Sequence, residues 1–225
     1  MVIHKIKNYF RAYKMHPKLI SIHVPKAAGT SFKGILEYLY GRSLLPIYQN
    51  ELNKKIWNHE RIEISQKYRA IQGHFPATQQ LLESFPDAKL ISWVRHPLNR
   101  LVSYYYYWLQ RPGHNNPNHD RFIKEKPSLV EFSSWEFMQG ELNSYFQVPI
   151  EQFDYIGIVE NYEESFKRMS KILGWPTVNQ IKSNVGKYPK AQISKSEILE
   201  IEKNLKDDIE LYQLIVKKFD HGGLS

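Results

Sequence analysis

The stretch that decides the fold is Leu19-Ile20-Ser21-Ile22-His23-Val24-Pro25-Lys26-Ala27-Ala28-Gly29-Thr30-Ser31-Phe32. It begins with a short apolar run, which is typical of a buried strand. Pro25 ends that run, because proline has no N–H to donate to a β-ladder. Apolar residues then recur at helical spacing before Gly41, which is placed to end a helix: Phe32, Ile35, Leu36 and Leu39. The stretch therefore predicts a strand, a tight loop of small residues and a helix.

This loop is a candidate anion site. The free N–H groups of the loop and the positive end of the helix face one point, and small side chains let a phosphate or sulfate approach the backbone. Lys26, Thr30 and Ser31 add one charge and two hydroxyl groups. An ordinary turn with a solvated lysine remains the alternative, since short motifs often occur in proteins that lack the corresponding site. A Walker A loop is disfavoured, because there the lysine follows two glycines, whereas Lys26 precedes the only glycine.

Length and composition predict one globular domain over residues 1–225. The chain is 42% hydrophobic, and its net charge of +8 indicates anionic partners: nucleic acid, a membrane surface, or acidic small molecules and glycans. The absence of cysteine excludes disulfides, thiolate catalysis and cysteine-ligated zinc. No apolar run approaches the ~20 residues that span a bilayer, and the N-terminus lacks the apolar core of a signal peptide. Residues 1–18 are basic and predict a leading helix, packed on the domain or in peripheral contact with a membrane.

The rest of the chain predicts strands at 68–74, 89–94 and 155–159, separated by helices. We expect irregular structure with a short helix at 42–68, a loop at 111–126, a helix from Leu129 to Phe146 with or without a break, and one last helix through 198–216. Strands that alternate with helices predict a parallel α/β sheet covered on both faces. Ligands in such sheets bind where the strands end, so Lys26, His74 and Arg95 are expected to share one edge.

Two motifs resemble a known family. Val24-Pro25-Lys26-Ala27-Ala28-Gly29-Thr30-Ser31-Phe32 resembles the 5′-phosphosulfate loop of sulfotransferases that use 3′-phosphoadenosine 5′-phosphosulfate (PAPS), most closely in the carbohydrate group with the heparan and uronosyl 2-O-sulfotransferases. Val94-Arg95-His96-Pro97-Leu98-Asn99-Arg100-Leu101-Val102-Ser103-Tyr104 resembles the family's second motif. A weaker resemblance runs from Tyr155 to about Lys190. The resemblance to this family implies a three-layer α/β/α fold of the P-loop NTPase-like kind, with 111–147 as an insertion on the acceptor side.

The resemblance also implies a donor site, made of Lys26, Ala27, Ala28, Gly29, Thr30, Ser31, Phe32, Arg95, Ser103 and Lys190. Lys26 is expected to stabilise the leaving phosphate, with no metal required. Arg95 and Ser103 are expected to bind the 3′-phosphate, since the planar fork of arginine forms two parallel bonds; a surface ion pair is the alternative for Arg95.

His74 stands where the 2-O-sulfotransferases carry their catalytic base, in Gly73-His74. An unperturbed histidine titrates near pH 6.5, close to what a base requires. A structural hydrogen bond to a loop is the alternative. His96 is the next candidate, although its position favours a capping role.

Two further groups of residues are weaker candidates. A late loop with Asn184, Gly186, Lys187 and Lys190 is expected to close over the nucleotide. The aromatic residues Trp108, Trp135 and Tyr145, with Arg111, are expected either to line an acceptor cleft or to belong to the core, and the core is favoured for Trp135.

We therefore expect an enzyme that sulfates a hydroxyl of a carbohydrate or other acceptor, an anionic one included, and that does not bind nucleic acid. The alternatives are a P-loop kinase and a non-catalytic basic module for anionic glycans. Animal carbohydrate sulfotransferases typically carry one membrane helix. Its lack here suggests a bacterial cytoplasmic enzyme or the soluble catalytic domain of a Golgi-type enzyme.

Overall fold

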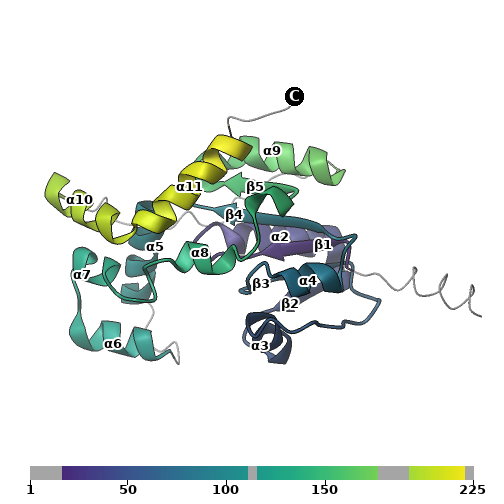
Figure 1. The fold of residues 1–225 in the computed structure, drawn as a ribbon, viewed down its shortest axis with the longest axis horizontal. Coiled ribbons are helices and arrows are strands. Elements are labelled where there is room, and N and C mark those ends of the chain that lie inside the picture. Colours follow the sequence, from purple (N-terminus) through teal and green to yellow (C-terminus); the bar gives the residue numbers. More distant parts are fainter. Residues whose placement is uncertain (1–16, 111–115, 177–192, 221–225) are drawn as a thin grey trace, which may run out of the picture.

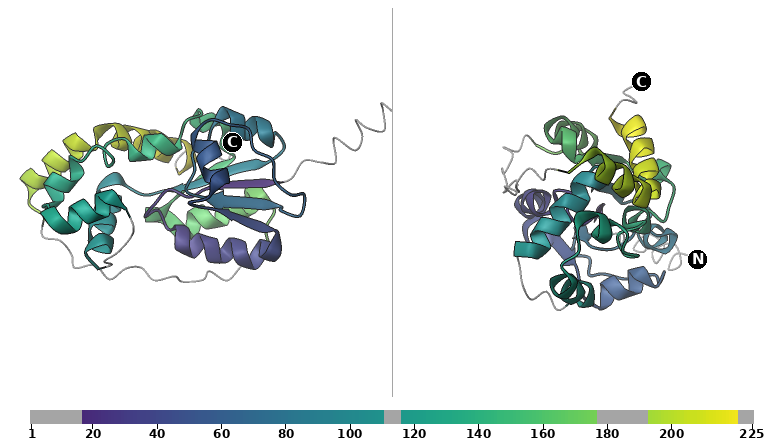
Figure 2. Two further views of the ribbon diagram at one scale, coloured as in Figure 1. Left: turned by 90° about the horizontal axis from the view of Figure 1, so that it is seen from below. Right: turned by 90° about the vertical axis from the view of Figure 1, so that its left-hand side faces the viewer.

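The computed structural model describes residues 17–110, 116–176 and 193–220. Its centre is one sheet of five parallel strands in the order β2-β3-β1-β4-β5 (Figure 1). The strands are β1 (Leu19–Ile22), β2 (Leu44–Ile47), β3 (Ala70–Gly73), β4 (Lys89–Val94) and β5 (Tyr155–Ile158). Helices α2 (Gly29–Tyr40) and α9 (Tyr162–Leu173) cover one face, and α4 (Gln79–Ser84) and α11 (Lys206–Phe219) lie on the other (Figure 2). This is the three-layer parallel α/β fold predicted from the sequence.

The register of the central strands brings three loops together. Ile22 at the end of β1 lies opposite Gly73 at the end of β3 and opposite Ser92 near the end of β4. The Ser92 hydroxyl donates to the Ile22 carbonyl at 3.1 Å, which ties β4 to β1 at this level. The segments after β1, β3 and β4 therefore leave the sheet at the same edge. This confirms the shared edge expected for Lys26, His74 and Arg95.

Several helix ends follow the predicted signals. The Thr78 hydroxyl accepts from the Leu81 N–H at 3.1 Å and caps α4. Gly41 follows α2 with φ of 50°, and Gly174 follows α9 with φ of 64°, a backbone conformation that favours glycine. The predicted capping boxes are present at the starts of α7 (Leu129–Ser133) and α10 (Lys195–Asn204).

Two expectations about loops were wrong. Residues 44–47 form the edge strand β2 where irregular structure was expected, and Pro46 is tolerated because an edge strand pairs on one side only. Residues 117–125 form α6 (Pro117–Glu125) inside the predicted loop. The Asn116 side chain caps it and Pro117 occupies its first turn, so prolines and asparagines that indicate a loop here begin a helix.

The C-terminal helices are also more divided than expected. The predicted last helix is two helices, α10 and α11, which meet at Leu205. Of the two forms expected for the helix from Leu129 to Phe146, the structure has the one with a break: α7 ends at Ser133, and α8 (Glu141–Tyr145) follows Gly140, which has φ of 72°. The short helix expected within 42–68 is confirmed as α3 (Glu51–Trp57), which follows β2. The predicted leading helix, 1–18, lies outside the described residues except for its last two.

A second hydrophobic cluster lies beyond the edge where the strands end. Helix α5 (Pro97–Gln110) leaves β4 and carries this cluster with α6, α7 and α10, a group that we call the helical lobe (Figures 1 and 2). Its buried members are Leu101, Trp108, Phe122, Phe132, Trp135, Met138, Ile201 and Leu205. Trp108 and Trp135 are therefore core residues, and Tyr145 is buried in the main core. Of the two expectations for these aromatic residues, core packing is confirmed.

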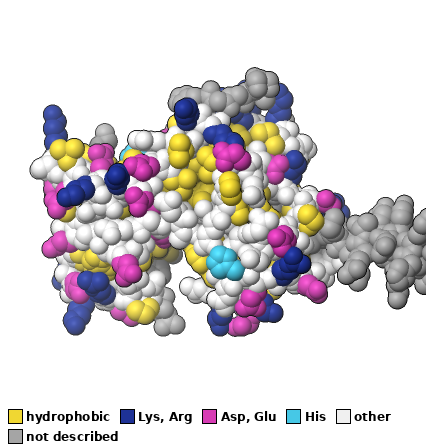
Figure 3. Space-filling model, in the orientation of Figure 1, with side chains coloured by type: hydrophobic (Ala, Val, Ile, Leu, Met, Phe, Trp, Pro, Cys, Tyr) yellow, Lys and Arg dark blue, Asp and Glu magenta, His cyan; other side chains and the backbone are white. Residues whose placement is uncertain are grey.

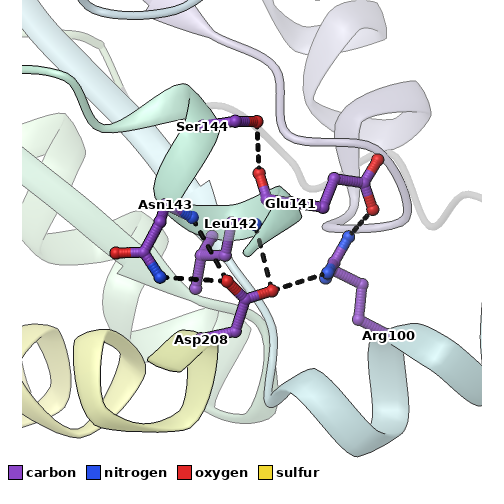
Figure 4. Close-up of polar contacts among 6 residues, drawn as sticks. All are labelled: Arg100, Glu141, Leu142, Asn143, Ser144 and Asp208. Atoms are coloured by element: carbon purple, nitrogen blue, oxygen red, sulfur yellow. Dashed lines mark hydrogen bonds and ion pairs between the residues drawn. The ribbon is translucent and has the colours of Figure 1, made fainter. Parts of the chain in front are cut away.

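A buried ion cluster fixes α5 in place (Figure 4). The Arg100 guanidinium has no exposed surface and donates to Glu141 and, at 3.1 Å, to Asp208. Asp208 also accepts from the Leu142 N–H at 3.0 Å and from the Asn143 side chain at 3.0 Å. Burial raises the pKa of Glu141, and the charge of Arg100 acts in the opposite direction. One side chain thus joins α5 to α8 and α11.

Arg100→Met is expected to lower the free energy of unfolding by about 3–5 kcal/mol, because it leaves two buried carboxylates without their cation. Urea denaturation measures this. Lys206→Met removes the exposed pair with Glu210 and is the matched control, with an expected change within about 1 kcal/mol. An Arg100→Met protein as stable as the control would show that the cluster does not hold the fold.

Candidate active site

The loop between β1 and α2 is strained and ends in an uncapped helix. Lys26 and Ala28 have φ values of 64° and 58°, which are unusual for residues with a side chain. Each such residue costs on the order of 1–3 kcal/mol and is typical of functional sites. Ala28 occupies the N-cap of α2, so no side-chain oxygen caps the first turn, and that turn has no acidic residue. The positive end of α2 is therefore available to an exogenous anion.

Lys26 reaches from this loop toward the helical lobe. Its ammonium lies 3.7 Å from the centroid of the Tyr107 ring on α5, a cation–π contact. Tyr107 belongs to the aromatic run of α5, but nothing in the sequence pairs it with Lys26, which is 81 positions away. The contact joins the loop after β1 to the helical lobe, at the edge where the strands end.

The second motif forms the end of β4 and the inner face of α5. Arg95 follows β4 directly, and the buried Ser103 lies one helical turn before Tyr107 on the same face of α5. The motif thus runs from the sheet edge to the lysine contact. Arg95 and Ser103 both lie on this path, and their binding of a 3′-phosphate stays a prediction.

Glu160 caps the start of α5. Its carboxylate accepts from the His96 N–H at 3.0 Å, the Asn99 side chain at 2.9 Å and the Tyr212 hydroxyl at 3.1 Å. His96 occupies the position before the helix, as expected, but it is Glu160 from η3 (Val159–Asn161) that supplies the capping oxygen. The His96 ring packs edge-on against Tyr212 at 5.2 Å.

His74 lies in a cluster with a second histidine and a tyrosine. Its ring centroid is 4.4 Å from that of His23 and 4.8 Å from that of Tyr48, and His23 Nδ1 is 3.0 Å from the Tyr48 hydroxyl. The His74 carbonyl accepts from the Asn53 and Trp57 side chains of α3, at 2.8 and 3.0 Å, which fixes the backbone here. Sequence reasoning named His74 as a candidate and did not name the neighbouring His23 or Tyr48.

Burial keeps both imidazoles neutral. It lowers the pKa of His74 to about 4. Burial, followed by the charges of His74, Lys33 and Lys26, lowers the pKa of His23 to about 3. The expectation that His74 titrates near neutrality was wrong, because desolvation disfavours the imidazolium. His74 Nε2 is buried and has no hydrogen-bond partner among the described residues. A neutral ring accepts a proton, as a general base must.

The remaining predicted residues divide into three groups. Thr30 is exposed and Ser31 half-buried at the start of α2, beside the buried Ala27 and Gly29. The Phe32 ring is buried between Trp93 and Trp175, and its N–H donates to the Ala28 carbonyl, so Phe32 packs the core. Outside the described residues lie Arg111, Asn184, Gly186, Lys187 and Lys190.

A family model described as the sulfotransferase family matches residues 11–221. The chain belongs to this family. It is therefore an enzyme of sulfuryl transfer, which decides against the kinase alternative. No curated protein matches the chain. Within the described ranges, no helix of the sulfotransferase has the length and apolarity to cross a membrane.

Two solved structures are similar to the sulfotransferase. One is the sulfotransferase from Alicyclobacillus acidocaldarius, with 12% identity, a TM-score of 0.42, and coverage of 88% of this chain and 99% of that one. The other is mouse sulfotransferase SULT7A1 complexed with PAP, with 15% identity, a TM-score of 0.40, and coverage of 88% and 67%.

The buried histidines predict acid sensitivity of the fold. An unfolded histidine takes up a proton below about pH 6.5, whereas folded His74 does so only near pH 4, so stability is lost as the pH falls through this window. By pH 4 the loss from His74 is roughly 3 kcal/mol. Urea denaturation from pH 7 to 4 should show a weaker pH dependence for His74→Asn than for the wild type.

His59→Asn is the matched control, because His59 is exposed. It should keep the wild-type dependence. Identical slopes for His74→Asn and the wild type would contradict the lowered pKa of His74.

Proposed function

We propose that the sulfotransferase uses PAPS to sulfate a hydroxyl of a carbohydrate. The observation that carries the proposal is the uncapped start of α2, which follows a strained loop with Lys26 and shares its sheet edge with His74. A positive helix end, an ammonium and a neutral imidazole are the groups that in-line sulfuryl transfer requires.

The residues present fit such a donor. The first turn of α2, with Gly29, Thr30 and Ser31, would hold the 5′-phosphosulfate, because small residues and an uncapped helix admit an anion to the backbone. Arg95, at the start of the second motif, and Ser103, near its end, would hold the 3′-phosphate. Lys190 remains part of this proposal from the sequence alone.

The chain's residues divide the chemistry between them. Bound PAPS supplies the sulfuryl group: the bond from sulfur to the phosphate oxygen breaks, and a bond from sulfur to the acceptor oxygen forms. His74 takes the proton of the acceptor hydroxyl. Lys26 stabilises the electron pair left on the phosphate oxygen. The proposal needs no metal, since Lys26 and backbone N–H groups supply positive charge.

We place the acceptor between the helical lobe and the sheet. The surface is hollowed between the helical lobe and the sheet in Figure 3, and the helical lobe faces the edge where the strands end. Residues 111–147 would supply the acceptor side. Trp108, Trp135 and Tyr145 lie in the cores, and Tyr104, Tyr105 and Tyr107 pack against the core of the helical lobe. The half-buried Tyr106 of α5 is outside both clusters, and we propose it as an aromatic contact for a sugar. The net charge of +8 favours an anionic acceptor. A bacterial cytoplasmic location remains a prediction from the sequence.

The nucleotide preference tests the donor assignment. Adenosine 3′,5′-bisphosphate (PAP) should bind more than tenfold more tightly than AMP in calorimetry, because each charge-assisted hydrogen bond to the 3′-phosphate contributes roughly 1.5–3 kcal/mol. Arg95→Ala should remove most of this difference, and Arg42→Ala, at an exposed position, should not. Equal affinity of the wild type for both nucleotides would refute the assignment. A non-catalytic module would show no saturable affinity for PAP.

The two catalytic roles should separate in kinetics run with EDTA throughout. His74→Asn should lower turnover by about 10²–10⁴-fold and leave PAP affinity nearly unchanged, because a base contacts the acceptor. Lys26→Ala should lower turnover and also weaken PAPS binding, since the ammonium contacts the ground-state donor. His59→Asn is the control for His74. Wild-type turnover in His74→Asn would place the base elsewhere, with His96 as the next candidate.

A further inference from the structure

His23 is a second histidine of the site, and its ring lies against the start of α2. A Cβ atom built on Gly29 would come within 1.5 Å of His23 Nε2 and 2.0 Å of its Cδ2. The imidazole therefore occupies the space that any side chain at position 29 would need. Its Nε2 lies at the first residue of the helix, where the 5′ end of the donor is proposed to bind.

The other nitrogen of this ring is held from across the sheet. His23 Nδ1 is 3.0 Å from the hydroxyl of Tyr48, which follows the edge strand β2, and the two rings meet edge to face with centroids 5.9 Å apart. Burial raises the pKa of Tyr48 to about 12, so its hydroxyl keeps its proton at neutral pH. Among the described residues, Tyr48 is the hydrogen-bond partner of the His23 ring, and Nε2 has none.

The position of an anion then decides the tautomer. With an anion at the start of α2, a lone pair on Nε2 would face negative charge, whereas an N–H there would donate a hydrogen bond. Tyr48 can donate to Nδ1 in that tautomer, so both ring nitrogens are satisfied. A neutral imidazole at a helix start is a hydrogen-bond donor that adds no charge to a site already holding Lys26 and Lys33 nearby.

We propose that His23, oriented by Tyr48, is a donor-binding residue that donates its Nε2–H to an oxygen at the 5′ end of PAPS. This rests on the proposed function. It explains why position 29 is glycine by a contact within the chain, because a side chain there would displace His23. It also assigns roles to both rings of the His23–His74 contact: His23 binds the donor, and His74, packed against it, takes the acceptor proton.

The test compares PAP with adenosine 3′-phosphate, which lacks the 5′ group, by calorimetry. His23→Leu should weaken PAP binding roughly 10- to 100-fold, the loss of one hydrogen bond to a charged group, and leave the 3′-phosphate ligand unaffected. Tyr48→Phe keeps the aromatic packing and should weaken PAP binding by less. The double variant should bind PAP no more weakly than His23→Leu alone, because the hydroxyl acts through His23. Tyr38→Phe, at a tyrosine 73% exposed on α2, is the control.

A direct readout is ¹⁵N NMR of the imidazole nitrogens of the wild type. With PAP bound, His23 should carry its proton on Nε2 and none on Nδ1. Unchanged PAP affinity in both His23→Leu and Tyr48→Phe, or a proton on Nδ1, would overturn the proposal while leaving PAP binding intact. Failure of the wild type to bind PAP would instead overturn the proposed function and this inference with it. Thermal unfolding shows whether His23→Leu folds. If this variant does not fold, the PAP affinity of Tyr48→Phe and the NMR of the wild type together test the proposal.

Discussion

A buried arginine controls how the two halves of this molecule meet. Arg100 has no contact with water, so its charge must be balanced inside the protein, and Glu141 and Asp208 do this from α8 and α11. Losing Arg100 would leave two buried carboxylates without their cation, which is far more costly than losing an apolar contact. These pairs hold α5 against α8 and α11. Ser103 and Tyr107 lie on the same helix, so the ion cluster also decides where the second motif and the partner of Lys26 are held.

Parallel pairing of β1 with β3 and β4 supplies the second constraint. Because the ends of these strands are level, segments 23–28, 74–76 and 95–96 leave one edge together. The left-handed backbone at Lys26 and Ala28 is tolerated because strands and α2 hold both ends of the loop. Lys26 contacts Tyr107 because α5 begins at this edge, next to the loop that carries Lys26. The site is thus built where two independent cores, those of the sheet and of the helical lobe, face each other.

The sequence predicted those features that local patterns encode. The β1–loop–α2 unit, the Thr78 cap, both capping boxes and Gly174 each depend on residues within a few positions of one another. What it missed depends on contacts between distant segments. β2 is four residues long and exists only by pairing with β3, and α6 begins with the asparagine and proline that also indicate loops. His23 and Tyr48 are 25 positions apart and meet only across the sheet. The low pKa of His74 follows from burial, which a motif does not report.

Burial of the two imidazoles has opposite effects on the proposed reaction. It guarantees that His74 and His23 are unprotonated at neutral pH, so a proton acceptor and a neutral donor are both ready without an adjustment of pH. It also makes His74 a weaker base than free histidine, because the imidazolium that forms is poorly solvated. An anionic donor at the start of α2 would offset that penalty, since its negative charge stabilises a positive charge beside it. Donor binding would then raise the basicity of His74 at the moment when an acceptor proton has to be removed, and in the absence of the donor the base would stay weak.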